Sequence, residues 1–210
     1  MTVRHHFAPG MSVGLFGGSF DPPHAGHRLV SLTALKALQL DRIWWLVSPQ
    51  NPLKQHAPKD IAARVAACRA LAGHPKIFVS DEETRLGTQY AIDTVRRLKA
   101  ANPGVRFIWL MGADNLHGFR RWQHHDIIAQ TVPIAVLDRP GYSYRAISAG
   151  WYLLKDRQPV ARFRMMALGA HSKPPVWCFI AGRRHHASAT ALRQAGQDPA
   201  SQGAFVESHN

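Results

Sequence analysis

The stretch Met11-Ser-Val-Gly-Leu-Phe-Gly-Gly-Ser-Phe-Asp-Pro-Pro-His-Ala-Gly-His27 decides the fold at the start of this chain. Its first six residues form a short apolar run that predicts a buried strand, and residues 27–40 place leucines at helical spacing. Gly17 and Gly18 let the backbone turn tightly and approach a ligand closely, because they carry no Cβ. The stretch therefore predicts a strand, a glycine turn and a helix, as at the start of a βα unit.

The start of this helix is predicted to hold an anion. We expect Asp21 to cap the helix and Pro22 or Pro23 to lie in its first turn, where a missing amide hydrogen costs nothing. The free amides of a helix N-terminus attract phosphate, and the spacing of His24 and His27 puts both imidazoles on one face. Taken alone, the histidine pair is explained equally well by an exposed surface. A zinc site is a weaker alternative, because the stretch has no third ligand and no neighbouring Glu.

The whole string resembles the signature of the nucleotidyltransferase superfamily, in which a glycine-rich turn precedes His-x-Gly-His and a nucleotidyl group is transferred from a triphosphate. The form found here, Phe20-Asp-Pro-Pro-His24, is similar to that of the bacterial nicotinate-nucleotide adenylyltransferase family. By this resemblance, the residues that contact ATP at the turn are Gly17, Gly18, Ser19, Phe20, His24 and His27.

Length and composition indicate a single enzyme-sized domain. The chain has 210 residues and 46% hydrophobic residues, enough for one α/β domain with a substantial core. It shows no apolar stretch of membrane-spanning length and no signal peptide, so we expect a cytoplasmic protein without membrane partners. Cys68 and Cys178 lie among apolar neighbours, which favours buried free thiols.

The charge balance is strongly basic. Lys and Arg number 26 against 13 Asp and Glu, a formal net charge of +13. Such a balance attracts polyanions, but the basic residues are scattered and no nucleic-acid-binding motif accompanies them. We therefore expect nucleotide substrates and no nucleic-acid partner. A basic Rossmann-like protein that binds RNA and only retains a nucleotide pocket is the alternative from a different class.

Strand and helix patterns alternate along the chain, which predicts an α/β fold with a Rossmann-like, doubly wound, mostly parallel sheet of about six strands and helices on both faces. A single domain is expected over 11–194, with flexible tails at 1–10 and 195–210. The stretch 141–175 is the least legible, with helical fragments such as 145–155 but no clear strand. Expected strands are 11–16, 43–47, 77–79, 105–111, 132–137 and 176–180; expected helices are 27–40, 59–71, 90–101, 114–119, 122–130 and 188–194.

Two further motifs extend the resemblance toward the triphosphate. The proline-rich loop Ser48-Pro-Gln-Asn-Pro-Leu-Lys54 follows the second predicted strand, and in the family the lysine of this loop reaches the phosphates. An ordinary solvated lysine is the alternative for Lys54. Near the C-terminus, Ala187-Ser-Ala-Thr-Ala-Leu-Arg193 resembles a second superfamily fingerprint, which implies that Ser188, Thr190 and Arg193 contact ATP. Alone, it would be no more than a capped helix.

The remaining motifs concern the nucleoside parts of the substrates. Met111-Gly-Ala-Asp-Asn115 follows the fourth predicted strand and resembles the family's Gly-x-Asp, which implies that Gly112 and Asp114 bind ATP, Asp114 through the ribose. The pyridine nucleotide is assigned by the same resemblance to Tyr90, Ile92, Trp122 and Gln123. Ala91 stands where the family has threonine, so a hydroxyl contact is lost there. Packing and capping explain Tyr90 equally well, and burial in the core is the alternative for Trp122.

The resemblance implies adenylyl transfer from ATP to nicotinate mononucleotide, giving deamido-NAD and pyrophosphate. His24, His27, Lys54 and Arg193 are the residues expected to stabilise the transition state, with magnesium carried by the phosphates and no protein metal site. Nicotinamide mononucleotide, phosphopantetheine or a choline-type phosphate used with CTP are alternative acceptors within the superfamily.

Overall fold

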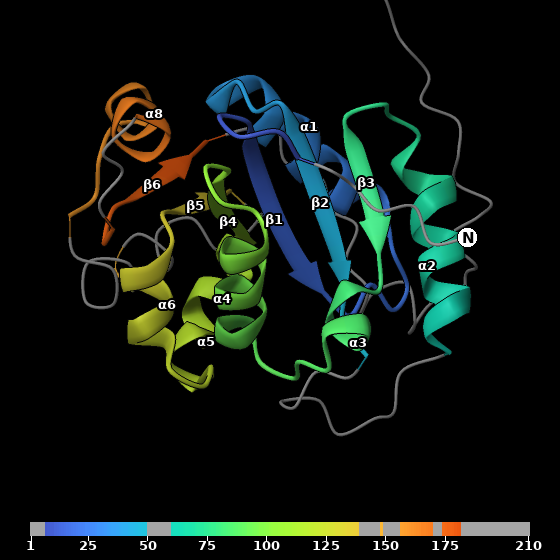
Figure 1. Cartoon of the computed structure of the whole chain (residues 1–210). Helices are drawn as coiled ribbons and strands as arrows, with labels where there is room; N and C mark the ends of the chain where they lie inside the picture. The colour runs from blue at the N-terminus through green and yellow to red at the C-terminus, as the bar shows by residue number, and fades with distance from the viewer. Residues whose placement is uncertain (1–6, 50–59, 139–147, 149–155, 170–173, 182–210) are drawn as a thin grey trace, which may run out of the picture.

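The computed structural model describes residues 7–49, 60–138, 148, 156–169 and 174–181 (Figure 1). In these ranges one parallel sheet has the strand order β3-β2-β1-β4-β5-β6. This is the order of doubly wound nucleotide-binding folds, so the predicted α/β, Rossmann-like class is confirmed. The strands are β1 (Ser12–Gly18), β2 (Arg42–Val47), β3 (Ile77–Ser80), β4 (Arg106–Gly112), β5 (Ile134–Leu137) and β6 (Trp177–Ile180).

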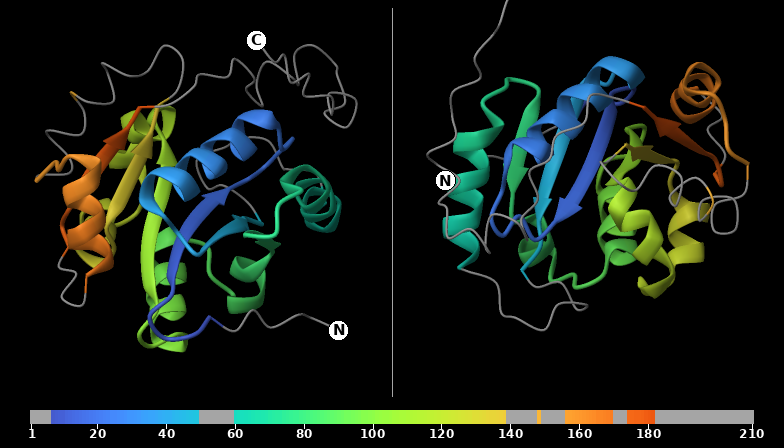
Figure 2. Two further views of the ribbon diagram at one scale, coloured as in Figure 1. Left: turned by 90° about the horizontal axis from the view of Figure 1, so that it is seen from above. Right: turned by 180° about the vertical axis from the view of Figure 1, so that it is seen from behind.

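Helices cover both faces of the sheet (Figure 2). The first face carries α1 (Ala25–Leu38), α2 (Ile61–Ala72) and α8 (Val160–Leu168), whose apolar side chains share one core. The second face carries α4 (Ala91–Ala101), α5 (Ala113–Gly118), the 3-10 helix η1 (Phe119–Arg121) and α6 (His125–Thr131). The short helix α3 (Glu82–Leu86) contacts β2 and α4.

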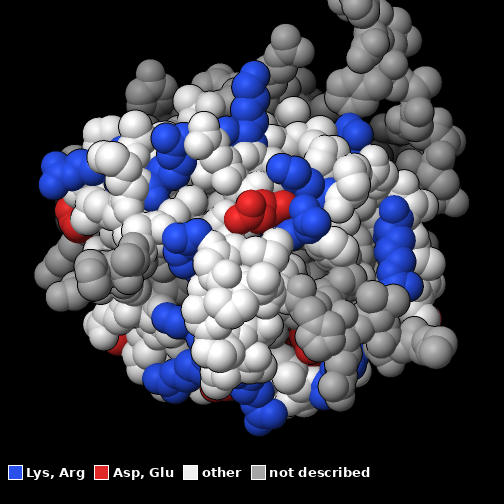
Figure 3. Space-filling model, turned by 45° about the horizontal axis from the view of Figure 1, so that its top comes forward, with Lys and Arg blue, Asp and Glu red and all other residues white. Residues whose placement is uncertain are grey.

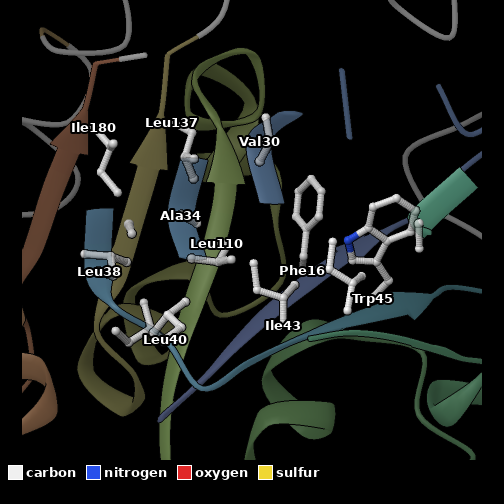
Figure 4. Close-up of a cluster of buried hydrophobic side chains, with 14 of the residues drawn as sticks. Phe16, Val30, Ala34, Leu38, Leu40, Ile43, Trp45, Leu110, Leu137 and Ile180 are labelled. Atoms are coloured by element: carbon white, nitrogen blue, oxygen red, sulfur yellow. The ribbon is translucent and has the colours of Figure 1, made fainter. Parts of the chain in front are cut away.

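Strand alternation supplies the two cores. In β4, Trp109 faces the second-face core while the neighbouring Leu110 faces the first. The tryptophans expected in the core are confirmed there, since Trp44, Trp45 and Trp109 are at most 4% exposed. Figure 4 shows the first-face core, where side chains of α1 meet those of the strands. Both faces are therefore buried, as a parallel sheet requires.

Three local expectations are wrong. Helix α3 was not expected from the sequence, and α8 lies in the stretch 141–175, where the sequence indicated helical fragments but not this helix. The predicted helix 122–130 begins only at His125, because His124 has a left-handed backbone (φ 53°). Phe7, expected in a flexible tail, is buried and packs against Trp44 with ring centroids 5.2 Å apart. The packed domain therefore begins earlier than residue 11.

The two cysteines are buried and free, as expected. Burial raises the pKa of the Cys68 thiol to about 12 and raises the pKa of Cys178 as well. Both thiols therefore stay protonated and unreactive near neutral pH.

Surface charge is spread out on the face shown in Figure 3, where Lys and Arg side chains are distributed rather than gathered in one patch. Among the helices of the described ranges, none has the length and apolar character needed to cross a membrane.

Candidate active site

The strand order places the glycine turn at the switch point of the sheet. Strands β1 and β4 are neighbours, and the chain leaves them toward β2 and β5 in opposite directions. In such sheets the crevice at the carboxyl ends of these two strands binds the ligand. Gly17 and Gly18 end β1, and Gly112 ends β4 and caps α5. The structure therefore brings together two motifs that lie far apart in the sequence.

The histidine pair forms a reciprocal cap on α1. The Gly26 amide donates to His24 Nδ1 over 3.1 Å, and the His24 amide donates to His27 Nδ1 over 3.1 Å. Because both Nδ1 atoms accept, the hydrogen-bond partners assign the ring proton to Nε2 in each imidazole. The ring centroids are 3.9 Å apart, so the expected shared face is confirmed.

The expected cap at Asp21 is wrong, because the cap is His24 and α1 begins at Ala25. A residue before a proline is biased away from helical backbone, and both Asp21 and Pro22 precede a proline. The helix therefore starts only after Pro23. Its first turn holds no acidic residue, so nothing there offsets the positive end of the helix dipole.

Aromatic rings hold His27 in place. Its ring centroid lies 4.8 Å from that of Phe20 and 6.0 Å from that of Phe16. Phe20 stacks on Trp45 with centroids 5.1 Å apart and planes 17° from parallel. Phe20 also has a left-handed backbone (φ 45°), which a non-glycine residue adopts only when its surroundings require it. The turn is thus fixed by packing as well as by its glycines.

Trp109 links the glycine turn to Trp122. A Cβ added at Gly17 would lie 2.9 Å from the Trp109 ring, so that ring occupies the space that glycine leaves. The Trp109 ring also meets Trp122 edge to face, with centroids 6.1 Å apart. Trp122 is partly buried and contacts Phe119 with centroids 5.5 Å apart. Only the Trp109 ring therefore separates Trp122, which is assigned to the pyridine ring, from Gly17, which is assigned to ATP.

The other assigned residues within the described ranges lie at the starts of α4 and α5 and in the turn before α6. Tyr90 is the N-cap of α4 and is partly buried, and the Ile92 side chain is in the core, which leaves only its backbone for a ligand. Asp114 is partly buried in the first turn of α5, and Gln123 is exposed. Lys54, Ser188, Thr190 and Arg193 lie outside the described residues.

Comparison with known proteins gives the family. The cytidylyltransferase-like family model matches residues 15–195. A probable nicotinate-nucleotide adenylyltransferase of Cereibacter sphaeroides is 48% identical over 187 residues, which cover 89% of this chain and 99% of that one. One of Agrobacterium fabrum is 48% identical over 186 residues, covering 87% and 98%. The chain belongs to this adenylyltransferase family.

Solved structures agree on the fold of the family. The nicotinic acid mononucleotide adenylyltransferase of Plasmodium falciparum, solved in complex with NaAD, has a TM-score of 0.63 at 15% sequence identity. The match covers 88% of this chain and 83% of that one.

One buried residue beside the glycine turn was not singled out from the sequence. Arg64 is 3% exposed and donates to backbone carbonyls of both loops at this edge of the sheet. The sequence contained a signal for it: in the helix expected over 59–71, Arg64 lies at helical spacing from the apolar residues Ile61 and Cys68 and so shares their face. A charged residue on such a face needs partners inside the protein.

Within the described ranges, no three His, Cys, Asp or Glu side chains come together in a way that would hold a metal ion.

Proposed function

We propose that this protein transfers the adenylyl group of ATP to nicotinate mononucleotide, giving deamido-NAD and pyrophosphate. The observation that carries the proposal is the pair of histidines that caps α1 at the switch point of the sheet. It occurs in a chain that is 48% identical to probable nicotinate-nucleotide adenylyltransferases. The matches cover 99% and 98% of these two relatives.

The chemistry needs no protein nucleophile. The 5′-phosphate of the mononucleotide is already anionic near neutral pH and attacks the α-phosphorus of ATP in line, while the bond to pyrophosphate breaks. The protein positions the two phosphates and stabilises the charge that moves onto the leaving oxygen. His24 and His27 would donate Nε2–H groups to these oxygens, beside the positive end of α1. Lys54 and Arg193 would add cationic contacts to the triphosphate.

The remaining assignments follow the layout of the site. ATP would be bound by the glycine turn, by the residues that follow β4 and by the C-terminal motif. These residues are Gly17, Gly18, Ser19, Phe20, Gly112, Asp114, Ser188 and Thr190. The pyridine side would use the Trp122 ring, with Tyr90, Ile92 and Gln123 around the carboxylate. Magnesium would arrive with ATP, bound mainly by phosphates and water. We also propose that the protein is cytoplasmic. Its partners would be its small-molecule substrates, with no nucleic acid and no membrane among them.

Substrate choice is the direct test. We expect ATP with nicotinate mononucleotide to release pyrophosphate faster than ATP with nicotinamide mononucleotide, because a carboxylate accepts backbone N–H bonds more strongly than an amide does. Initial rates of pyrophosphate release are measured with these two acceptors and phosphopantetheine at equal concentration. Equal rates, or faster turnover of nicotinamide mononucleotide or phosphopantetheine, would contradict the proposal.

Replacing Trp122 by alanine is expected to raise KM for the mononucleotide by about 10-fold, because the pyridinium ring loses a cation–π contact with the indole. Steady-state kinetics with each substrate varied in turn measure this effect. Trp122→Phe keeps an aromatic face and should recover part of the loss, while KM for ATP stays near the wild-type value in both variants. A Trp122→Ala protein with lowered thermal stability but a normal KM for the mononucleotide would show that Trp122 serves only the core.

A further inference from the structure

Arg64 is a buried cation beside the phosphate-binding edge of the sheet. It lies on α2 and is 3% exposed, while Arg69 on the same helix is exposed. Burial lowers the pKa of Arg64, and the nearby carboxylate of Asp21 acts in the opposite direction. An arginine retains its charge in proteins, so this guanidinium is a permanent cation in the interior. Such a group requires strong acceptors.

Its acceptors are main-chain carbonyls of two loops. Arg64 Nη1 donates to the Ser19 carbonyl over 2.6 Å and to the Ser48 carbonyl over 2.8 Å, and Nη2 donates to the Pro49 carbonyl over 3.1 Å. Ser19 belongs to the glycine turn after β1, and Ser48 and Pro49 directly follow β2. One side chain on a helix thus joins the two loops that the family motifs assign to the triphosphate.

The contact with Ser19 also sets the polarity of the turn. A carbonyl oxygen carries partial negative charge and would repel a phosphate, whereas the Ser19 oxygen is held against the guanidinium. In a trans peptide the N–H points opposite to the C=O, so the Phe20 amide is directed away from Arg64. Phe20 itself has the left-handed backbone that needs external support. Arg64 therefore stabilises both the shape of the turn and the side on which its donors lie.

We propose that Arg64 is a positioning residue for the triphosphate, which holds Ser19 of the glycine turn, and Ser48 and Pro49 after β2, in the arrangement that binds ATP without itself contacting the substrate. This inference rests on the proposed function for the assignment of these loops to ATP. A guanidinium suits the task because its planar fork reaches several acceptors at once, which the single ammonium of a lysine does not.

Three variants test the inference. Arg64→Lys keeps the positive charge but loses the planar guanidinium, and Arg64→Met keeps much of the side-chain length but loses the charge. Arg69→Met, on the exposed side of α2, is the matched control. Binding of ATP alone is measured by titration calorimetry, and KM is measured for ATP and for nicotinate mononucleotide. Arg64→Lys is expected to weaken ATP binding by roughly 10-fold or more, with Arg64→Met worse. KM for the mononucleotide should change by less than about twofold, and Arg69→Met should match the wild type.

A purely structural role would give a different pattern. An Arg64→Lys protein with lowered thermal stability but wild-type ATP affinity, or with equal losses for both substrates, would overturn the inference. If Arg64→Met does not fold, Arg64→Lys alone decides between these outcomes. The ATP titration needs no turnover, so a wild-type protein that binds ATP but releases no pyrophosphate would contradict the proposed function and leave this test intact.

Discussion

Replacing His24 by alanine is expected to lower kcat by roughly 100-fold or more, with a much smaller change in KM for either substrate. His24 is 3% exposed and its Nδ1 is occupied by the Gly26 amide, so its remaining donor is Nε2–H. A fixed donor in a buried setting stabilises charge that develops in the transition state without reorganising during the reaction. Steady-state kinetics of pyrophosphate release measure the two parameters.

The alanine variant also removes the cap of α1, which costs about 1 kcal/mol of stability by itself. His24→Asn separates the two roles, because an asparagine oxygen caps a helix well but its short side chain does not place a donor where Nε2–H lies. We expect His24→Asn to recover the thermal stability and to keep the low kcat. Recovery of kcat in His24→Asn would show that His24 serves the helix and not the reaction.

Replacing Glu83 by glutamine is expected to stabilise the protein above neutral pH. Burial raises the pKa of Glu83 from its ordinary value of 4.5 to about 7, and the residue is 6% exposed. Between pH 4.5 and 7 the folded state holds a proton that the unfolded chain has lost, so the free energy of unfolding falls as pH rises through this window. A shift of this size corresponds to a loss of up to about 3 kcal/mol by pH 8.

Urea unfolding at several values between pH 5 and pH 8 measures this loss. Glu83→Gln mimics the protonated carboxyl, so its stability should depend less on pH and exceed that of the wild type at pH 8. Glu82→Gln is the matched control, because it removes the ion pair with Arg85 (2.6 Å) and leaves Glu83 intact. An unchanged decline with pH in Glu83→Gln would assign the dependence to other groups.

The sequence predicted the sheet because its signals are local. A buried strand in a parallel sheet is a short apolar run, and such runs alternate here with helical spacing from residue 11 onward. The missed helices show the limit of the same signals. Helix α3 has only five residues, too few for an apolar pattern to repeat from one turn to the next, and α8 exposes Met165 while burying only Phe163 and Ala167.

The sequence also identified the glycine turn and the histidine pair, because their types and spacing are unusual in so short a stretch. It placed the helix start wrongly, since two prolines satisfy the general preference for proline in a first turn but also bias the residues before them toward extended backbone. Which atom caps α1, and therefore which nitrogen of each imidazole carries its proton, depends on the turn geometry seen only in the structure.

By itself, then, the sequence determined the strands in their order along the chain, the family motifs and the residue types that suit a nucleotide, because each of these signals lies within a short stretch of chain. The tertiary structure decided which of these motifs meet. The contact of Gly17 with Trp109, the approach of Trp109 to Trp122 and the three carbonyls around Arg64 join segments that are separated in sequence. Local propensity carries no information on such contacts, because they arise only when the sheet order sets strands side by side and packing fixes the side chains between them.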